Sequence, residues 1–201
     1  DNLVELKDIE SSICLMAVTD DAISSIASQL SFRYTILAHT SGSVPLEAIS
    51  SAASKYAIFY PLQSFQLHKS PDWKEIPIFL EAHHEIIYPV LERLAKILSS
   101  KVIRLDSDNR QYLHLAAVFA NNFTNHLYHA AYQILNEKGM SFEWLLPLIK
   151  ESVNRIGDKD PAELQTGPAK RGDQKTIEKH LKLLDQHEDF YLIDVREESE
   201  Y

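Results

Sequence analysis

The sequence predicts an α/β domain built on a mostly parallel sheet, followed by an all-α domain. Up to about residue 105, short apolar runs alternate with segments whose apolar residues recur every three or four positions. This alternation is typical of a parallel sheet covered by helices. From residue 108 to Lys138 the chain contains neither proline nor glycine, which predicts one long helix. We therefore place residues 1–105 in the α/β domain and residues 106–201 in the helical domain.

Five apolar runs are expected to form the strands of the first domain. They are 13–18, 34–38, 57–60, 76–80 and 102–105. The first run, Ile13–Val18, has no polar residue, as expected for a strand buried on both faces of a parallel sheet. The fourth contains Pro77, which cannot donate a hydrogen bond to a neighbouring strand. This proline predicts that the fourth strand lies at a sheet edge.

Helices are expected between these strands and throughout the second domain. The predicted ranges are 21–30, 45–53, 83–98, 108–137, 141–156 and 174–187. Pro45 suits the first turn of its helix, and Asp106 to Asp108 suit the cap of the long one. The segment Phe190–Val195 fits either a strand or a last helical turn.

Composition limits the classes of partner. A chain of 201 residues that is 45% hydrophobic can bury a core, and a net charge of -9 argues against nucleic acid or an anionic membrane as partner. Cys14 is the single cysteine, so no disulfide can form within the chain, which favours a cytoplasmic location. No apolar run approaches the roughly 20 residues that span a bilayer.

The candidate binding residues follow the first three strands, because ligands of open α/β sheets bind outside the carboxyl ends of the strands. They are Val18, Thr19, Asp20, His39, Thr40, Ser41, Gly42, Pro61 and Gln63. Hydroxyls, backbone amides and a flexible glycine in the segment 39–43 can meet a ribose or a nicotinamide amide. The alternative is an ordinary turn between strand and helix, capped by Ser43.

The long helix carries polar residues that share one face. His114, Asn121 or Asn122, and Asn125 recur at three- and four-residue steps or multiples of them. This face could close over a ligand, where His114 or an asparagine binds substrate or relays a proton. The alternative is a ladder of hydrogen bonds between helices. The histidine clusters at 83–84 and 126–129 do not match a zinc spacing, so no metal site is expected.

The stretch Thr166–Asp173 contains two glycines, a proline and a basic pair. It could be a simple connection between helices, capped by Asp173. Alternatively, its backbone amides and Arg171 contact an anionic or polar group.

Five motifs occur together, in this order. They are 18–23 (VTDDAI), 39–43 (HTSGS), 60–65 (YPLQSF), 117–123 (AVFANNF) and 166–173 (TGPAKRGD). This series resembles the Rossmann-like oxidoreductases that carry a DUF2520 C-terminal region and are related to pyrroline-5-carboxylate reductase. The resemblance extends from about Ser11 to about Leu184.

The resemblance implies a dinucleotide-binding domain, a helical domain that forms a homodimer, and a cofactor between them. The cofactor would be NADP, with NAD left open, and hydride would pass between its nicotinamide and a small carbonyl or imine substrate. The residues that follow the strands would lie beside the cofactor, with Gly167 and Pro168 facing it. We expect His114 to donate a proton, and Asn121 and Ser41 to orient the substrate or the carboxamide.

One departure from the family leaves alternatives open. The sequence has no G-x-G-x-x-G turn, which holds the pyrophosphate in such domains. Either the first phosphate-binding unit is missing from this chain or ordinary cofactor binding has been lost. The alternatives to an enzyme are therefore a non-catalytic nucleotide-binding or scaffold protein, and a soluble interaction domain without a nucleotide site.

Overall fold

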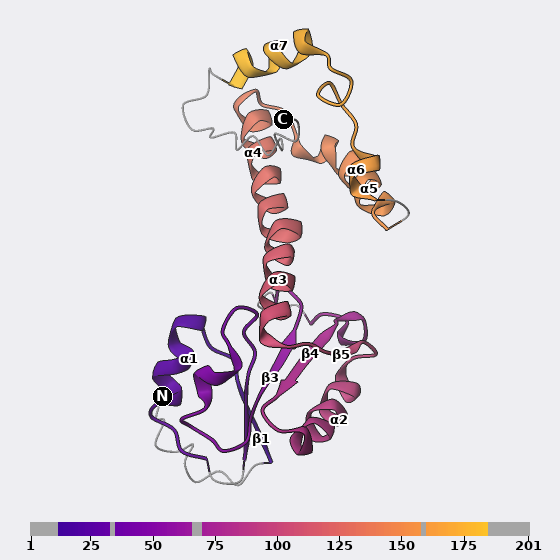
Figure 1. The fold of residues 1–201 in the computed structure, drawn as a ribbon. Helices are drawn as coiled ribbons and strands as arrows, with labels where there is room; N and C mark the ends of the chain where they lie inside the picture. Colours follow the sequence, from indigo (N-terminus) through magenta and orange to yellow (C-terminus); the bar gives the residue numbers. More distant parts are fainter. Residues whose placement is uncertain (1–11, 33–34, 66–69, 158–159, 185–201) are drawn as a thin grey trace, which may run out of the picture. The chain divides into compact units, whose positions relative to one another are not determined.

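A computed structural model of the chain describes residues 12–32, 35–65, 70–157 and 160–184. The described residues include a five-stranded sheet with the strand order β1-β2-β3-β4-β5 (Figure 1). The strands are β1 (Ile13–Met16), β2 (Ile36–His39), β3 (Tyr56–Pro61), β4 (Ile78–Ala82) and β5 (Val102–Arg104). All five predicted strands are therefore present, with boundaries shifted by a few residues.

The sheet is mostly parallel, as predicted. The pairs β1–β2, β2–β3 and β4–β5 are parallel, and β3–β4 is antiparallel. Register places Leu15 opposite Ala38 and Ala38 opposite Ala57. The carboxyl ends of β1, β2 and β3 consequently lie along one edge of the sheet.

Helices cover both faces of the sheet (Figure 1). Helix α1 (Asp20–Ala27) and the 3-10 helix η2 (Leu46–Ile49) pack on the face that carries Leu37 and Ile58. Helix α2 (Tyr88–Leu98), which follows the 3-10 turn η4 (Glu85–Ile87), packs on the opposite face. Because side chains alternate along a strand, the buried strands supply apolar residues to both cores.

The position predicted for the fourth strand is wrong. Strand β4 lies between β3 and β5, not at a sheet edge. Pro77 precedes the strand, and its carbonyl accepts a hydrogen bond from the Leu62 amide at 2.9 Å. The proline is tolerated because it stands at the point where pairing begins, where its missing N–H breaks no ladder.

Four predicted helices differ from the structure, and two of them, 83–98 and 141–156, differ only because they begin with a 3-10 helix. The segment after Pro45 forms only the short η2, in which amides bond to carbonyls three positions earlier, as Ala48 does to Pro45 at 3.2 Å. The long helix is divided into α3 (Ser107–Ala117), a π-helical segment η5 (Val118–Phe123) and α4 (Thr124–Glu137). Asp106 caps α3 as expected, since its carboxylate accepts from the Asn109 amide at 2.8 Å.

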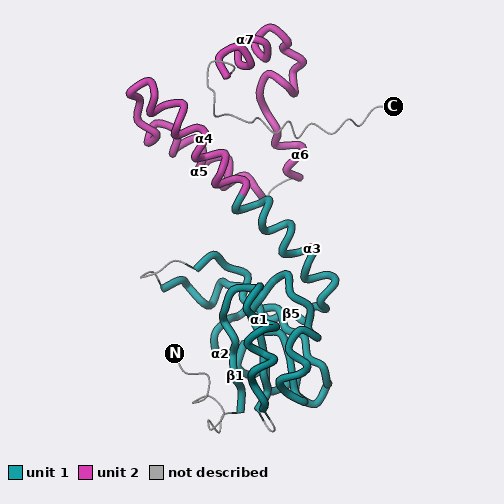
Figure 2. Tube along the Cα trace, turned by 90° about the vertical axis from the view of Figure 1, so that its left-hand side faces the viewer, with its two compact units in different colours: residues 1–122 teal, residues 123–201 magenta. Residues whose placement is uncertain are grey.

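The chain divides into two compact units, residues 1–122 and 123–201 (Figure 2). After α4, the second unit contains the 3-10 helix η6 (Phe142–Leu145), α5 (Leu146–Arg155), α6 (Pro161–Leu164) and α7 (Gln174–Leu184). The domain boundary near Leu105 stays a prediction. The ambiguous segment Phe190–Val195 and the predicted last turn of the helix 174–187 lie outside the described residues.

Among the described residues, no helix is both long enough and apolar enough to cross a membrane.

Candidate functional site

Three loops meet at the carboxyl ends of the first three strands. The loop after β1 carries Val18, Thr19 and Asp20, the loop after β2 runs from Thr40 to Pro45, and the loop after β3 begins beyond Pro61. These are the segments that the sequence selects as candidate binding loops. The side chains along this edge include hydroxyls, one carboxylate and two imidazoles.

His39, the last residue of β2, is completely buried and fixes the start of the second loop. Its Nδ1 accepts a hydrogen bond from the Ser41 amide at 3.2 Å, and its Nε2 lies 3.3 Å from the Pro45 carbonyl oxygen. Since a carbonyl only accepts, Nε2 must carry the proton. The imidazole is therefore neutral and contacts both ends of the loop.

The surroundings of His39 oppose its protonation. Burial, followed by the nearby Arg110 charge, lowers the pKa of His39 from 6.5 to about 4. The Pro45 carbonyl and Asp20 act in the opposite direction but are weaker. If Nδ1 were protonated, its N–H would face the Ser41 N–H, and the hydrogen bond that Nδ1 now accepts from Ser41 would be lost.

The hydroxyl of Ser41 caps the turn that follows. It accepts hydrogen bonds from the Ser43 and Val44 amides at 3.1 and 3.0 Å. The predicted turn cap is therefore present, but Ser41 supplies it in place of Ser43. The hydroxyl of Ser43 instead donates to Asp20 at the start of α1, which joins the first loop to the second.

Asp20 is exposed and stays ionised. Although partial burial acts to raise its pKa, the hydroxyls of Ser43 and Ser41 and the nearby imidazole of His114 lower the pKa overall. The edge of the sheet therefore presents a negative charge. An anionic ligand group would be repelled at this position.

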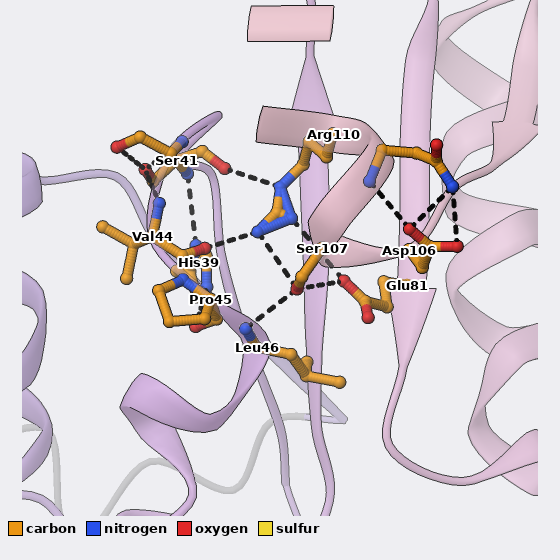
Figure 3. Close-up of polar contacts among 11 residues, drawn as sticks. His39, Ser41, Val44, Pro45, Leu46, Glu81, Asp106, Ser107 and Arg110 are labelled. Carbon is orange, nitrogen blue, oxygen red and sulfur yellow. Dashed lines mark hydrogen bonds and ion pairs between the residues drawn. The ribbon is translucent and has the colours of Figure 1, made fainter. Parts of the chain in front are cut away.

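Arg110 of α3 ties the second loop to the helix (Figure 3). The side chain is completely buried, and its Nε donates to the Ser41 carbonyl at 3.3 Å. Its Nη2 donates to the Val44 carbonyl and, at 3.3 Å, to the Ser107 hydroxyl. One guanidinium thus holds both carbonyls that flank the turn.

Glu81 of β4 balances the Arg110 charge. Its Oε2 lies 3.5 Å from Arg110 Nη1 and accepts a hydrogen bond from the Ser107 hydroxyl at 2.7 Å. Ser107 also accepts from the Leu46 amide at 3.1 Å. The first turn of α3 is consequently fixed to β4, to η2 and to the loop after β2 (Figure 3).

Gly42 makes room for a pair of side chains. The Tyr60 hydroxyl at the end of β3 lies 3.0 Å from Nδ1 of His114. A Cβ atom at position 42 would lie 2.7 Å from His114 Cγ and 2.9 Å from Tyr60 Cζ, too close for either ring. A glycine is therefore required at position 42 for the loop to pack against Tyr60 and His114. This requirement does not depend on any contact that Gly42 makes with a ligand.

The remaining candidates from the three loops lie near this edge. Thr40 is half-buried, and its hydroxyl lies 3.5 Å from the Met16 carbonyl. Val18 and Thr19 are exposed, and Pro61 is half-buried. Gln63 is exposed and its amide oxygen accepts from the Ser64 amide. Contact of these residues with a ligand stays a prediction.

Other candidates lie outside this cluster. Asn121 is exposed in η5, and its amide donates to Asn122 at 3.2 Å. Gly167 and Pro168 belong to the second unit, in a turn where the Asp173 amide donates to the Pro168 carbonyl. Asp173 caps α7 through Thr176, as the simple reading of this stretch predicts. The roles of Asn121, Gly167 and Pro168 stay predictions.

Arg110, Ser107 and Glu81 are site residues that the sequence did not single out, and Tyr60 appeared only as the first residue of the motif 60–65. A signal existed for two of them, because Ser107 and Arg110 precede His114 at steps of three and four on one helix face. Tyr60 lies in the buried strand β3, where aromatic residues are common, so its residue type gave no separate signal.

We expect the stability of the first unit to fall as pH decreases from about 6.5 to about 4. The unfolded His39 binds a proton in this range and the folded one does not, which costs up to about 3 kcal/mol of unfolding free energy. Denaturant unfolding of the wild type and of His39→Gln across this range measures the effect. A pH dependence that is equal in the two proteins would contradict it.

We also expect Gly42→Ala to destabilise the protein by about 1–3 kcal/mol through overpacking. His114→Ala should relieve part of this cost, because it removes the ring that the new methyl group meets. A double-mutant cycle in denaturant measures the coupling. Additive effects of the two substitutions would show that the close approach at Gly42 is not the cause.

Comparisons with known proteins agree with this architecture. A candidate NADP oxidoreductase from Bacteroides fragilis is 34% identical, with a TM-score of 0.82, over 90% of this chain and 72% of that chain. A Thermotoga maritima protein is 26% identical, with a TM-score of 0.75, over 89% and 73%. A reductive aminase from Aspergillus terreus, solved with NADPH and ethyl-5-oxohexanoate, shares the fold at 16% identity, with a TM-score of 0.54, over 73% and 55%. A comparison with the curated proteins finds no match.

These likenesses confirm the predicted fold, a Rossmann-type α/β sheet followed by helices. The family model described as Domain of unknown function (DUF2520) matches residues 76–195, more than half of the 201 residues. Its match starts just before β4 and includes Glu81, Arg110 and His114. The chain therefore belongs to the DUF2520 family, as the five ordered motifs indicate.

Proposed function

We propose that this protein is an NAD(P)-dependent oxidoreductase that transfers a hydride between a nicotinamide and a small carbonyl or imine substrate. The observation that carries the proposal is the half-exposed His114 imidazole, held by Tyr60 at the carboxyl ends of parallel strands. The 34% identical relative described as a candidate NADP oxidoreductase supports it.

The residues at this edge fit the nicotinamide end of a dinucleotide better than its phosphates. The loops 17–20, 40–45 and 61–65 contain hydroxyls and an amide but neither lysine nor arginine. Asp20 would repel a phosphate, whereas it can accept a hydrogen bond from a ribose hydroxyl or a carboxamide. Thr40, Thr19 and Gln63 are proposed to hold such neutral groups.

When bound, the cofactor would supply a hydride to the carbon of a C=O or C=N bond. The electron pair of that bond moves to oxygen or nitrogen, which then requires a proton. His114 is the proposed donor because its ring is half-exposed and lies in the cluster with Asp20 and Tyr60. Ser41 and Asn121 are proposed to orient the substrate or the carboxamide, with NADP as the expected cofactor and NAD left open.

Calorimetric titration of the intact protein with NADPH, NADH and their oxidised forms tests cofactor binding. We expect micromolar binding of a phosphorylated form, and reduction of at least one member of a carbonyl and imine panel. His114→Ala should lower this rate about 100-fold or more, whereas the exposed His84→Ala should leave it unchanged.

Three outcomes would redirect the proposal. Binding without turnover would favour a nucleotide-binding scaffold, and binding of none of the four dinucleotides would favour an interaction domain. An undiminished rate in His114→Ala would remove this residue from proton transfer.

We further propose that the protein is a homodimer joined through its second unit. None of the described residues of this unit, 123–157 and 160–184, is buried within one chain. Its exposed large apolar side chains include Leu127, Trp144 and Leu148, each about two-thirds exposed. A surface with so many apolar side chains is typical of a protein interface, and a second copy would provide the missing core.

Light scattering during gel filtration measures the assembly. We expect a mass of about twice the 23.0 kDa chain at micromolar concentration. Leu127→Glu should shift the mass toward the monomer, because it buries a charge in the apolar interface. Ile86→Glu is the matched control, since Ile86 is 82% exposed in the first unit. A monomeric wild type would contradict the proposal.

A further inference from the structure

We propose that Tyr60 is a positioning residue that fixes His114 in the tautomer with its proton on Nε2. The inference rests on the proposed function for its consequence, because it turns the remaining N–H of His114 into a defined hydrogen-bond donor for a substrate. The tautomer itself follows from the geometry of the Tyr60–His114 pair. The tautomer and the proposed function can therefore be refuted separately.

The first step is the proton on Tyr60. Burial raises the pKa of this phenol, an effect that the nearby Arg110 charge opposes more weakly. Tyr60 therefore keeps its proton at neutral pH. Tyr60 is 7% exposed, so its hydroxyl is expected to find a partner within the protein.

The second step is the direction of the hydrogen bond. His114 Nδ1, at 3.0 Å, is the polar partner found for the Tyr60 hydroxyl among the described residues. If Nδ1–H donated to the phenol oxygen, the buried phenolic proton would lack an acceptor there, which is unfavourable. If the phenol donates, both groups are satisfied. Tyr60 is therefore the donor, Nδ1 the acceptor, and Nε2 carries the proton.

The third step is the rigidity of the pair. Gly42 lies against both rings, and its neighbour Ser41 is held by Arg110, one helical turn before His114. The rings meet edge to face, with centroids 6.1 Å apart. The backbone of the loop and the hydrogen bond therefore act together against rotation of the imidazole.

The consequence concerns the other ring nitrogen. His114 is half-exposed and its Nδ1 is engaged by Tyr60, so Nε2–H is the ring donor that is left for a ligand. A single tautomer offers a donor at all times, whereas a mixture would offer an acceptor part of the time. A substrate oxygen or imine nitrogen, both acceptors, would be recognised by this donor. If Nε2–H then passes to that atom, Nδ1 takes the proton of the Tyr60 hydroxyl, so the imidazole stays neutral and the phenol regains its proton from solvent.

Nitrogen-15 spectra of the histidine rings in the intact protein test the proposal. The signals of His114 are assigned by their loss in His114→Gln. We expect Nε2 protonated and Nδ1 unprotonated at neutral pH. In Tyr60→Phe the tautomer ratio should shift by about fivefold, which corresponds to roughly 1 kcal/mol for one hydrogen bond. Tyr56→Phe is the matched control, because Tyr56 is also buried on β3 but stacks on His83.

A proton on Nδ1 in the wild type, or an unchanged ratio in Tyr60→Phe, would overturn the assignment whether or not a cofactor binds. Failure to bind any nicotinamide dinucleotide would instead overturn the proposed function and leave the tautomer standing. For a substrate that the carbonyl and imine panel identifies, Tyr60→Phe should lower kcat at least about tenfold and leave the KM for NADPH unchanged. An equal kcat would refute the positioning role.

Discussion

The buried guanidinium of Arg110 is the interaction on which the site depends. It donates to the carbonyls of Ser41 and Val44, and its charge is balanced by Glu81 from the sheet. Removing one partner of such a buried pair costs about 3–5 kcal/mol, since the other charge is left uncompensated. The conformation of the loop after β2 is thus linked to the presence of α3. Without that helix, two buried carbonyls and one carboxylate would lose a donor.

This link also sets the position of the ligand-facing groups. His114 follows Arg110 by one helical turn, so anchoring Arg110 beneath the loop brings the imidazole to Gly42 and Tyr60. Neutral His39 holds the same loop through the Ser41 amide and the Pro45 carbonyl. The positive charge of Arg110 therefore favours a neutral His39, because a second buried cation beside the first would be repelled.

The sequence predicts the strands and the three binding loops, because both follow from local patterns of apolar and turn residues. It does not predict that β4 is reversed and central, since Pro77 is compatible with any position at which pairing begins. It places Arg110 on the same helix face as His114 but does not identify it as an anchor, because its partners are backbone carbonyls more than sixty positions away. The candidates His39, Ser41, Gly42 and His114 do come together, although Ser41 and Gly42 shape the loop itself. Their contact with a ligand remains a prediction.

The two units differ in how they obtain their stability. The first buries apolar side chains on both faces of its sheet, so its site can be held by one chain. In the second, none of the described residues is buried, and hydrogen bonds at helix caps contribute only about 1 kcal/mol each. Helices of ten to fourteen residues, such as α4 and α5, are marginal in water without a packed face. Association of two second units would then contribute to their free energy of folding. The folding of the second unit would depend on protein concentration, whereas the folding of the His114 site would not.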